Sequence, residues 1–487
     1  MRNRRRGLCR QPQIDLLDER CLLSGLTPAQ VTAAYGLNAI SFTTSSGTPV
    51  KGDGSGVTIA LIEAYHDPTI ASDLSIFDQA FNLLPDPNLT VVDQTGNAVS
   101  VTAPSNSGWT EEESLDVEWA HACAPGANIL VVEANSQSIQ DLMAAVNTAR
   151  NTTGVVAVSM SWGFSETPNE TSYDSYFTTP PGHPGITFSA ASGDNGSLAG
   201  AIYPAASPNV LSVGGTTLLV SSSGAYQSES AWTGSGGGYS KYEPEPSYQA
   251  NVQSTGYKAT PDVAFDADPN TGGLVYVTLP TRSGSQGSWL TVGGTSLGTP
   301  AWAGIIAIAD QGRALRGEGS LDGSTQTLPL LYAAPSSDFH TVAAAPPSFG
   351  GGGGFGYGYG YGAFGSSSLF GGSGLGASAT TSSSSIGANT ATGLGTPNGP
   401  ALVSDLVTST LTTPVTPVTG SGGGTTPTPT PTPNPGGGGS RHHYRPTHHG
   451  SRPVKSGKTH PEAPARSRHV AQVSVPTKLS TARNLRD

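Results

Sequence analysis

The stretch Thr291-Val-Gly-Gly-Thr-Ser-Leu-Gly-Thr-Pro-Ala-Trp-Ala-Gly304 decides the fold. It follows a short β-type segment, residues 288–292, and leads into an apolar run rich in alanine and isoleucine that predicts a helix. Gly293 and Gly294 permit a tight turn, so we expect Ser296 at or near the helix N-terminus. Backbone N–H groups in the first helical turn have no partner within the helix and can stabilise a developing negative charge. The stretch therefore predicts a serine nucleophile, and a Gly-Thr-Ser helix cap is the equal alternative from those three residues alone.

Buried strands alternate with helices along the rest of the chain. Segments that are almost wholly apolar, as in strands covered on both faces, lie at 56–63, 128–133, 154–160, 184–193, 210–213 and 273–277. Helices are predicted from Thr27 as an N-cap, from Ser72 to Asn82 and from Ile139 to Arg150. This alternation predicts an α/β fold with a doubly wound, mostly parallel sheet, helices on both faces, and a site at the carboxyl ends of the strands.

Composition divides the 487 residues into four parts: a leader (1–25), a globular body (26–412), a Thr/Pro/Gly linker (413–439) and a basic, His-rich tail (440–487). A Gly/Ser-rich insertion (350–385) interrupts the body. The formal charge of −11 is unevenly distributed, because the body carries seven Lys and Arg against 29 Asp and Glu. Such a body suits an acidic medium, where protonation relieves self-repulsion; solubility alone is the simpler alternative.

Cysteine usage, hydropathy and the termini indicate where the chain acts. Cys123 is expected to be a packed helix residue, so no disulfide framework is implied. No apolar run approaches the ~18 residues of a transmembrane helix. Residues 18–24 resemble a short leader of some large bacterial exported proteins, so we expect a secreted or cell-envelope-associated protein. The basic tail can bind an anionic surface polymer; a solvated tail without a specific partner is the alternative, and no nucleic-acid partner is expected.

A catalytic base for Ser296 is predicted in Trp109-Thr-Glu-Glu-Glu-Ser-Leu-Asp116, which opens a helix with Thr110 as its N-cap. Glu112 and Asp116 are four residues apart, so they share one helix face and contact each other. Helices commonly begin with acidic residues, and a purely structural role is the alternative. A carboxylate near the reference pKa of ~4.3 stays ionised in mild acid, where histidine is protonated. The positive helix end is expected to help keep Glu112 ionised.

Together these segments resemble the sedolisins, the serine-carboxyl peptidases of the subtilisin-like clan, over roughly residues 26–407. Glu112 and Asp116 match the family's E-x-x-x-D pair, and Ser296 matches its G-T-S-x-x-x-P nucleophile. Asp194, in Ser192-Gly-Asp-Asn-Gly196, matches the aspartate that completes the oxyanion hole. The resemblance implies a subtilisin-like fold and an acid-active serine endopeptidase acting on polypeptides, with tripeptidyl-peptidase activity as a further possibility. It gives Asp116 the role of orienting the base.

The resemblance also implies residues that line the substrate. They belong to a strand and to a glycine-rich loop: Ser159, Ser161, Trp162, Gly163, Gly236 and Gly237. Glu63 and Asp67 lie where subtilisins keep their catalytic aspartate, but the sedolisin resemblance gives this position no chemistry. No His-Gly-Thr motif occurs, which disfavours a conventional subtilisin-type hydrolase.

Two departures from the family pattern bear on activity. Only about 25 residues precede the predicted domain, where sedolisins usually carry a long prosegment. The family's late calcium loop has carboxylates where this sequence has Thr341 and Asn389, leaving Asp338 as the nearby carboxylate, so we expect Ca²⁺ to bind weakly. These departures prompt the competing hypothesis of an inactive sedolisin-like domain that binds surfaces. The presence of all four matched catalytic residues favours the enzyme.

Overall fold

A central sheet organises the described residues, which in this computed structural model are 25–85, 88–100, 102–281, 284–344 and 389–411. Its eight strands run in the order β11-β10-β8-β6-β3-β5-β4, and β14 also pairs with β10. Only the β10–β11 pair is antiparallel. The strands are β3 (Thr58–Ala64), β4 (Leu89–Asp93), β5 (Asn128–Ala134), β6 (Val155–Met160), β8 (Thr187–Ala191), β10 (Val210–Val220), β11 (Tyr226–Ala231) and β14 (Val263–Asp266). The predicted fold class is confirmed.

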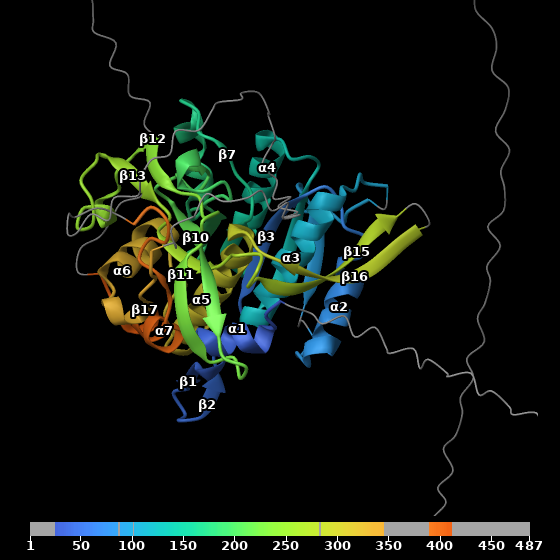
Figure 1. Cartoon of the computed structure of the whole chain (residues 1–487), viewed down its shortest axis with the longest axis horizontal. Helices are drawn as coiled ribbons and strands as arrows, with labels where there is room; N and C mark the ends of the chain where they lie inside the picture. Colours follow the sequence, from blue (N-terminus) through green and yellow to red (C-terminus); the bar gives the residue numbers. More distant parts are fainter. Residues whose placement is uncertain (1–24, 86–87, 101, 282–283, 345–388, 412–487) are drawn as a thin grey trace, which may run out of the picture. The chain divides into compact units, whose positions relative to one another are not determined.

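Helices cover both faces of this sheet (Figure 1). The α-helices are α1 (Pro28–Ala34), α2 (Ile70–Phe81), α3 (Ser107–Cys123), α4 (Ile139–Arg150), α5 (Thr295–Leu315), α6 (Leu328–Ala333) and α7 (Gly399–Thr408). Short 3-10 or π turns are η1 (Leu37–Ala39), η2 (Glu170–Phe177), η3 (Ser197–Ala199), η4 (Ser247–Gln249), η5 (Gly323–Thr327) and η6 (Ser336–Asp338). None of these helices is long and apolar enough to cross a bilayer.

Two-stranded ribbons surround the sheet. They are β1 (Ser41–Thr43) with β2 (Pro49–Lys51), β7 (Phe164–Ser165) with β9 (Ile202–Tyr203), β12 (Gly238–Pro244) with β13 (Tyr257–Thr260), β15 (Gly273–Thr281) with β16 (Gly284–Val292), and β17 (Phe339–His340) with β18 (Thr396–Pro397). The β15–β16 hairpin projects to one side (Figure 1) and leads straight into α5. The predicted β-type segment 288–292 is therefore the end of a nine-residue strand.

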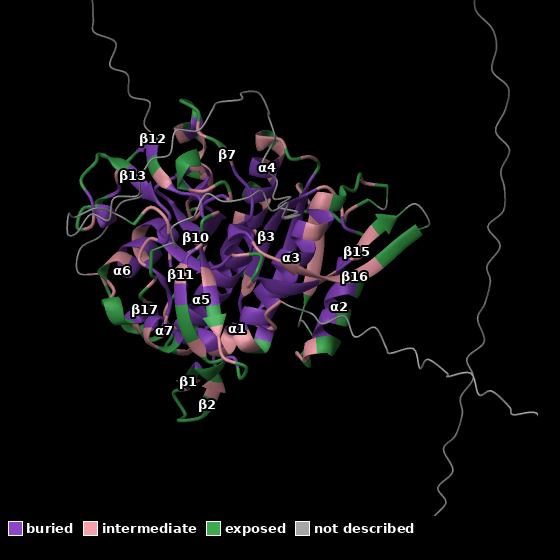
Figure 2. Ribbon diagram, in the orientation of Figure 1, coloured by how far each residue is buried: buried purple, intermediate pink, exposed green. Residues whose placement is uncertain are grey.

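Alternation along the strands divides the apolar residues between two cores. On β3, Ile59 and Leu61 pack into the core that contains α3 and α5, whereas Ala60 and Ile62 pack into the core with α4. Both cores are fully covered, which explains the near-continuous apolar strands (Figure 2).

Helix α5 is buried on all sides over most of its length and lies against α3. Small residues permit this close approach: a Cβ added at Gly304 would lie 3.0 Å from the Cβ of Cys123. Cys123 is a buried helix residue, as the sequence predicts, and forms no disulfide with another described residue. The pair α3–α5 therefore fixes the residues at the start of α5 against the first half of α3.

Two predicted helix starts are wrong. Helix α2 begins at Ile70 after Thr69, two residues before the predicted start at Ser72. Helix α3 begins at Ser107 with Asn106 as its N-cap, so Thr110 is an interior residue. The Asn106 carboxamide oxygen accepts from the N–H groups of Gly108 and Trp109, at 3.0 and 3.3 Å. Thr27, by contrast, is the N-cap of α1, as predicted, and the structure adds a capping box with Gln30.

The cap can be tested by stability. Asn106→Ala removes the acceptor for two helical N–H groups and should lower the free energy of unfolding by about 1 kcal/mol. The Thr110 hydroxyl makes no capping hydrogen bond, and valine has nearly the same shape as threonine. Thr110→Val should therefore change the free energy of unfolding little. Chemical denaturation of both variants measures the difference; a larger loss in Thr110→Val would contradict the assigned cap.

Candidate active site

The nucleophile candidate Ser296 is the second residue of α5. Strand β16 ends at Val292, and Gly294 precedes the helix with a φ of +101°, a conformation that favours glycine. A Cβ at Gly294 would also lie 2.8 Å from Asp194 Oδ2. Ser296 is 2% exposed, and its hydroxyl makes no hydrogen bond of ordinary length and angle. It therefore stands at a helix start, beside the unpaired N–H groups of the first turn.

Helix α3 brings Glu112 and Asp116 to this hydroxyl. The Glu112 carboxyl lies against Ser296: burial and then the charge of Asp116 raise its pKa, and the serine contact lowers it. Asp116 Oδ1 accepts a 2.9 Å hydrogen bond from Ser161 Oγ. Burial raises the pKa of Asp116 to about 7, against the lowering effect of Ser161 and Glu63. Both carboxyls therefore hold protons more tightly than exposed ones.

This environment corrects one electrostatic expectation. Because α3 begins at Ser107, Glu112 lies beyond its first turn and the helix N-terminus does not stabilise its charge. Burial acts in the opposite direction and raises the pKa of Glu112 well above its ordinary value. The carboxylate form of Glu112 must therefore depend on its neighbours.

Glu63, which the sequence analysis set outside the site, lies inside it. It is the next-to-last residue of β3, is fully buried, and makes a carboxyl–carboxyl contact with Asp116. Burial and then Asp116 raise its pKa, and neither Glu63 oxygen receives a hydrogen bond from another group. Two facing carboxyls need a shared proton, so Glu63 and Asp116 form one titrating unit. A carboxyl side chain near the end of an almost wholly apolar strand was the signal in the sequence.

Asp67 has a structural role instead. Its Oδ1 accepts from the N–H and the hydroxyl of Thr69, at 2.8 and 2.7 Å. These bonds stabilise the turn that precedes α2. Asp67 is therefore separate from the Glu63–Asp116 unit. This agrees with the sedolisin resemblance, which gives Asp67 no chemical role.

Asp194 approaches Ser296 from the segment after β8. Its Oδ1 accepts from the Thr295 N–H at 2.8 Å and from the Thr295 hydroxyl at 2.9 Å. Burial raises its pKa, and these two bonds lower it. Because Oδ1 is occupied as an acceptor, a proton on Asp194 belongs on Oδ2, the oxygen facing Gly294. That oxygen is free to donate to a group bound beside Ser296.

The predicted substrate strand is mostly interior. Ser159 and Trp162 are fully buried, and the Trp162 indole N–H donates to the Ile62 carbonyl at 3.0 Å. Their side chains are therefore unavailable to a substrate. Ser161 supports Asp116 and also lies 3.4 Å from the Ser296 carbonyl oxygen. A ligand could therefore contact this strand only through backbone groups near Gly163.

The glycine-rich loop packs directly on the segment that carries Asp194. The Gly236 N–H donates to the Gly193 carbonyl at 2.6 Å, and Ser192 Oγ donates to the Gly236 carbonyl at 2.9 Å. A Cβ at Gly236 would lie 2.4 Å from the Ser192 carbonyl oxygen, and one at Gly237 would lie 2.2 Å from the Thr390 carbonyl oxygen. The loop therefore needs glycine for close backbone approach.

The residues considered for calcium do not fit a calcium site. Asn389 Oδ1 accepts from the N–H groups of Ala391 and Thr392, at 3.0 and 3.2 Å, which forms a turn. Asp338 is buried and faces Asp405, and Thr341 is exposed. No three acidic, His or Cys side chains group as metal ligands within the described ranges. The predicted insertion, leader, linker and tail lie outside those ranges, apart from Gly25.

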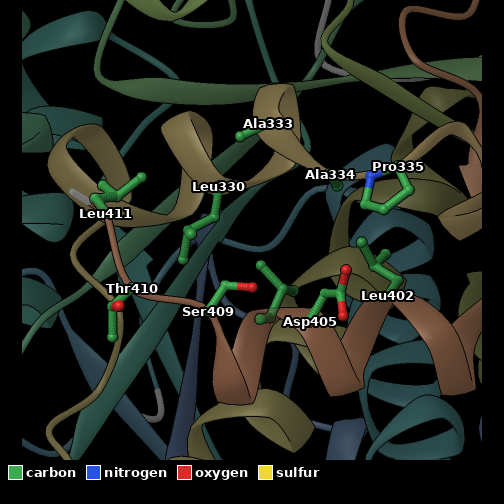
Figure 3. Close-up of a pocket in the computed structure, with 10 residues that line it drawn as sticks. Leu330, Ala333, Ala334, Pro335, Leu402, Asp405, Ser409, Thr410 and Leu411 are labelled. Carbon is green, nitrogen blue, oxygen red and sulfur yellow. The ribbon is translucent and has the colours of Figure 1, made fainter. Parts of the chain in front are cut away.

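Asp405 also borders a pocket between α6 and α7 (Figure 3). Apolar side chains such as Leu330, Leu402 and Leu411 line it, together with the Asp405 carboxyl. None of the residues grouped around Ser296 belongs to this pocket. It is therefore separate from the candidate active site.

Comparison with known proteins identifies relatives of this chain. The model of the Subtilase family matches residues 97–319, which include Glu112, Asp116, Asp194 and Ser296. Sedolisin from Pseudomonas sp. (strain 101) is 40% identical over 146 residues. The solved structure of Pseudomonas sedolisin, a serine-carboxyl proteinase complexed with two molecules of pseudo-iodotyrostatin, superposes with a TM-score of 0.59 and 26% identity, covering 78% of this chain and 97% of that one. These findings support assignment of the chain to the sedolisin family.

The sequence alignments with curated sedolisins are partial. The Pseudomonas alignment covers 25% of this chain and 24% of the relative. Kumamolisin from Bacillus sp. (strain MN-32) is 31% identical over 318 residues, which are 60% of this chain and 54% of the relative. The chain thus spans between a quarter and about half of these two sedolisin-family relatives.

The buried carboxyls predict that stability falls as pH rises. Glu63, Glu112 and Asp116 have raised pKa values, so the folded protein keeps protons that the unfolded chain releases above about pH 4.5. This contribution is complete below that pH and is lost progressively toward pH 7. Calorimetry on Ser296→Ala, which prevents self-digestion, should show a melting temperature that decreases from pH 4 to pH 8. A melting temperature that increases over this range would contradict the assigned burial.

Calcium should matter little to this protein. Thr341 and Asn389 supply no carboxylate, and the Asn389 oxygen is already used in a turn. A chelator should therefore change the melting temperature by no more than about 2 °C. A large loss of stability that added Ca²⁺ restores would show that other groups build the site.

Proposed function

We propose that this protein is an acid-active serine-carboxyl endopeptidase that cleaves polypeptides. The observation that carries the proposal is the convergence of three elements: α5 supplies Ser296, α3 supplies Glu112 and Asp116, and the segment after β8 supplies Asp194. A hydroxyl beside a buried carboxyl and a helix start is the arrangement that acyl transfer needs.

In the proposed reaction the Glu112 carboxylate accepts the Ser296 proton as Oγ attacks the substrate carbonyl carbon. The carbonyl oxygen becomes an oxyanion, and Glu112 then returns the proton to the leaving amine as the C–N bond breaks. Water hydrolyses the acyl-enzyme by the same proton transfers in reverse order. The loose contact between Ser296 and Glu112 is compatible with this role, because catalytic hydrogen bonds often tighten only when substrate binds.

The oxyanion would be stabilised by the Ser296 N–H and by a proton on Asp194 Oδ2. The two bonds that Oδ1 accepts from Thr295 support this assignment, because they fix the carboxyl and leave Oδ2 as the site of protonation. Burial raises the pKa of Asp194 and so favours the protonated donor in acid.

Asp116 would orient Glu112, and Glu63 would hold Asp116 through their shared proton. Ser161 adds a second fixed contact to Asp116, at 2.9 Å. Asp116 is thus held by both Glu63 and Ser161. These contacts keep the Asp116 carboxyl in place while Glu112 takes up the serine proton. Glu63 is thus a positioning residue in the proposed mechanism.

The alternative of an inactive surface-binding domain has less support, because the matched catalytic residues are all present and grouped. Secretion or attachment to the cell envelope, and an anionic partner for the basic tail, remain part of the proposal from the sequence. Cleavage within chains is the form of activity we propose, and removal of tripeptides is the alternative that the sequence leaves open.

The pH dependence of peptide hydrolysis tests the mechanism. The proposed mechanism needs one proton on the interacting Glu112 and Asp194 carboxyls, with that proton on Asp194. Burial raises the pKa of both groups, so activity on denatured protein should peak in acid and decline toward neutral pH as this last proton is lost. Asp194→Asn donates at any pH; it should lose part of its rate, and the alkaline limb of its profile should move to higher pH. Initial rates from pH 3 to pH 8 measure both effects.

Ser296→Ala is the control and should lose at least about 10³-fold in kcat. A histidine-based hydrolase would instead gain activity as its base deprotonates near ~6.5. A neutral optimum that Glu112→Gln leaves unchanged would contradict the serine-carboxyl proposal.

A further inference from the structure

Two segments that border the candidate active site continue beyond it and meet again. The first segment, residues 159–177, runs from β6 through Ser161 and β7 to η2. The second segment, residues 234–244, runs from the glycine-rich loop into β12. Near the site, the first segment contacts Asp116 through Ser161, and the second contacts Gly193 through Gly236. Away from the site they contact each other through acidic side chains.

One contact between the segments is an ordinary hydrogen-bonded one. Glu166 of the first segment accepts from the hydroxyl of Ser240 and from the N–H of Lys241, the latter at 3.2 Å. The Ser240 hydroxyl oxygen in turn accepts from the Glu243 N–H at 2.8 Å. These bonds fix the start of β12 against the chain that follows β7.

The second contact joins two carboxyl groups, Asp174 on η2 and Glu243 on β12. Both residues are at most 1% exposed. Neither oxygen of Glu243 receives a hydrogen bond from a donor, nor does Asp174 Oδ2, whereas Asp174 Oδ1 accepts from the Tyr203 hydroxyl at 3.1 Å. Two acceptors buried face to face are stable only if a proton lies between them.

The surrounding charges favour that proton. Burial, followed by the charge of Asp174, raises the pKa of Glu243 to about 9. The nearby Lys258 lowers it, but its ammonium group is already bound to the carbonyls of Ser207 and Val210, at 2.8 and 2.6 Å. The titratable groups that face the pair are Glu170 on η2, which is itself beside Glu166, Tyr203 on β9, and Lys258 on β13, which pairs with Asp262.

We propose that Asp174 and Glu243 form a proton-dependent link that holds the two substrate-binding segments together in acid and weakens as the pH rises. The inference rests on the proposed function, because the sedolisin resemblance is what makes these segments substrate-binding. It assigns Asp174 and Glu243 as positioning residues, acting on the site only through the segments that carry them.

The direction of the effect follows from linkage. When the segments separate, both carboxyls reach water and take ordinary pKa values near ~4. Below that pH both forms are protonated and the link is at full strength. Above it the separated form loses protons that the joined form keeps, so each pH unit shifts the ratio of joined to separated forms by up to about tenfold per retained proton. The shift continues until the joined pair itself deprotonates, near the pKa of about 9.

Separation would alter substrate binding more than chemistry. Gly236 and Ser161 lie near the starts of the two segments, whereas Glu243 and Asp174 lie near their ends, and the first two residues have their own bonds to Gly193 and Asp116. We therefore expect the link to change KM, whereas Glu112 and Asp194 set the pH dependence of kcat. Separate pH profiles of KM and kcat therefore distinguish the effect of the Asp174–Glu243 link from that of the catalytic groups.

Hydrogen–deuterium exchange in the full-length Ser296→Ala protein tests the link without requiring activity. Protection of residues 164–177 and 238–244 should fall at least about tenfold between pH 4.5 and pH 7.5, after correction for intrinsic exchange. Glu243→Gln in the same background replaces the shared proton by an amide donor, so its protection should change less than about threefold. Glu245→Gln, two residues along, is the matched control and should behave like the parent.

The link is overturned if the parent protects these segments equally at both pH values, or if Glu243→Gln keeps the parent's pH dependence. Should Glu243→Gln fail to fold, Asp174→Asn removes the same shared proton from the other partner, with the same expectation. In the active enzyme, KM should rise with pH and Glu243→Gln should flatten that rise while leaving the kcat profile unchanged. An active peptidase with pH-independent exchange refutes the link alone, whereas pH-dependent exchange without peptidase activity refutes only the proposed function.

Discussion

The burial of carboxyl groups without enough cations constrains this whole structure. The body has seven Lys and Arg against 29 Asp and Glu, and Lys258, which is fully buried, is engaged by Asp262 and by carbonyl groups. An unpaired buried carboxylate is too costly to persist, so the group keeps its proton or shares one with a neighbour. Protons therefore take the place that Lys and Arg occupy in many proteins, and the raised pKa values predict a folded state that is most stable in acid.

The same solution occurs on two sides of the sedolisin-type site. Glu63 meets Asp116 behind the proposed base, and Asp174 meets Glu243 between the two segments that border the site. In each pair at least one carboxyl has no donor partner among the described residues, so the shared proton makes the contact attractive. One pair belongs to the proposed chemistry and the other to the framework around it.

Local patterns made much of the fold and the candidate site predictable from the sequence. The apolar strands, the Gly293-Gly294 turn and the four-residue spacing of Glu112 and Asp116 each depend on neighbours in the chain. The predicted start of α3 was wrong because Asn106 and Thr110 are both good cap residues, and the structure uses Asn106. The Glu63–Asp116 and Asp174–Glu243 contacts join segments far apart in sequence, and no local pattern specifies them.

Buried carboxyl groups consequently influence both the stability of the fold and the proposed chemistry. A histidine base would be charged in the acidic range where the buried carboxyls are protonated and the fold is most stable. A glutamate base avoids this conflict, because a cluster that shares protons can place a single negative charge on Glu112 while its neighbours remain neutral. The raised pKa of Glu112 then makes that carboxylate a stronger base than an exposed glutamate would be. Burial thus both holds the protons that stabilise the fold and increases the basicity of the residue proposed to activate Ser296.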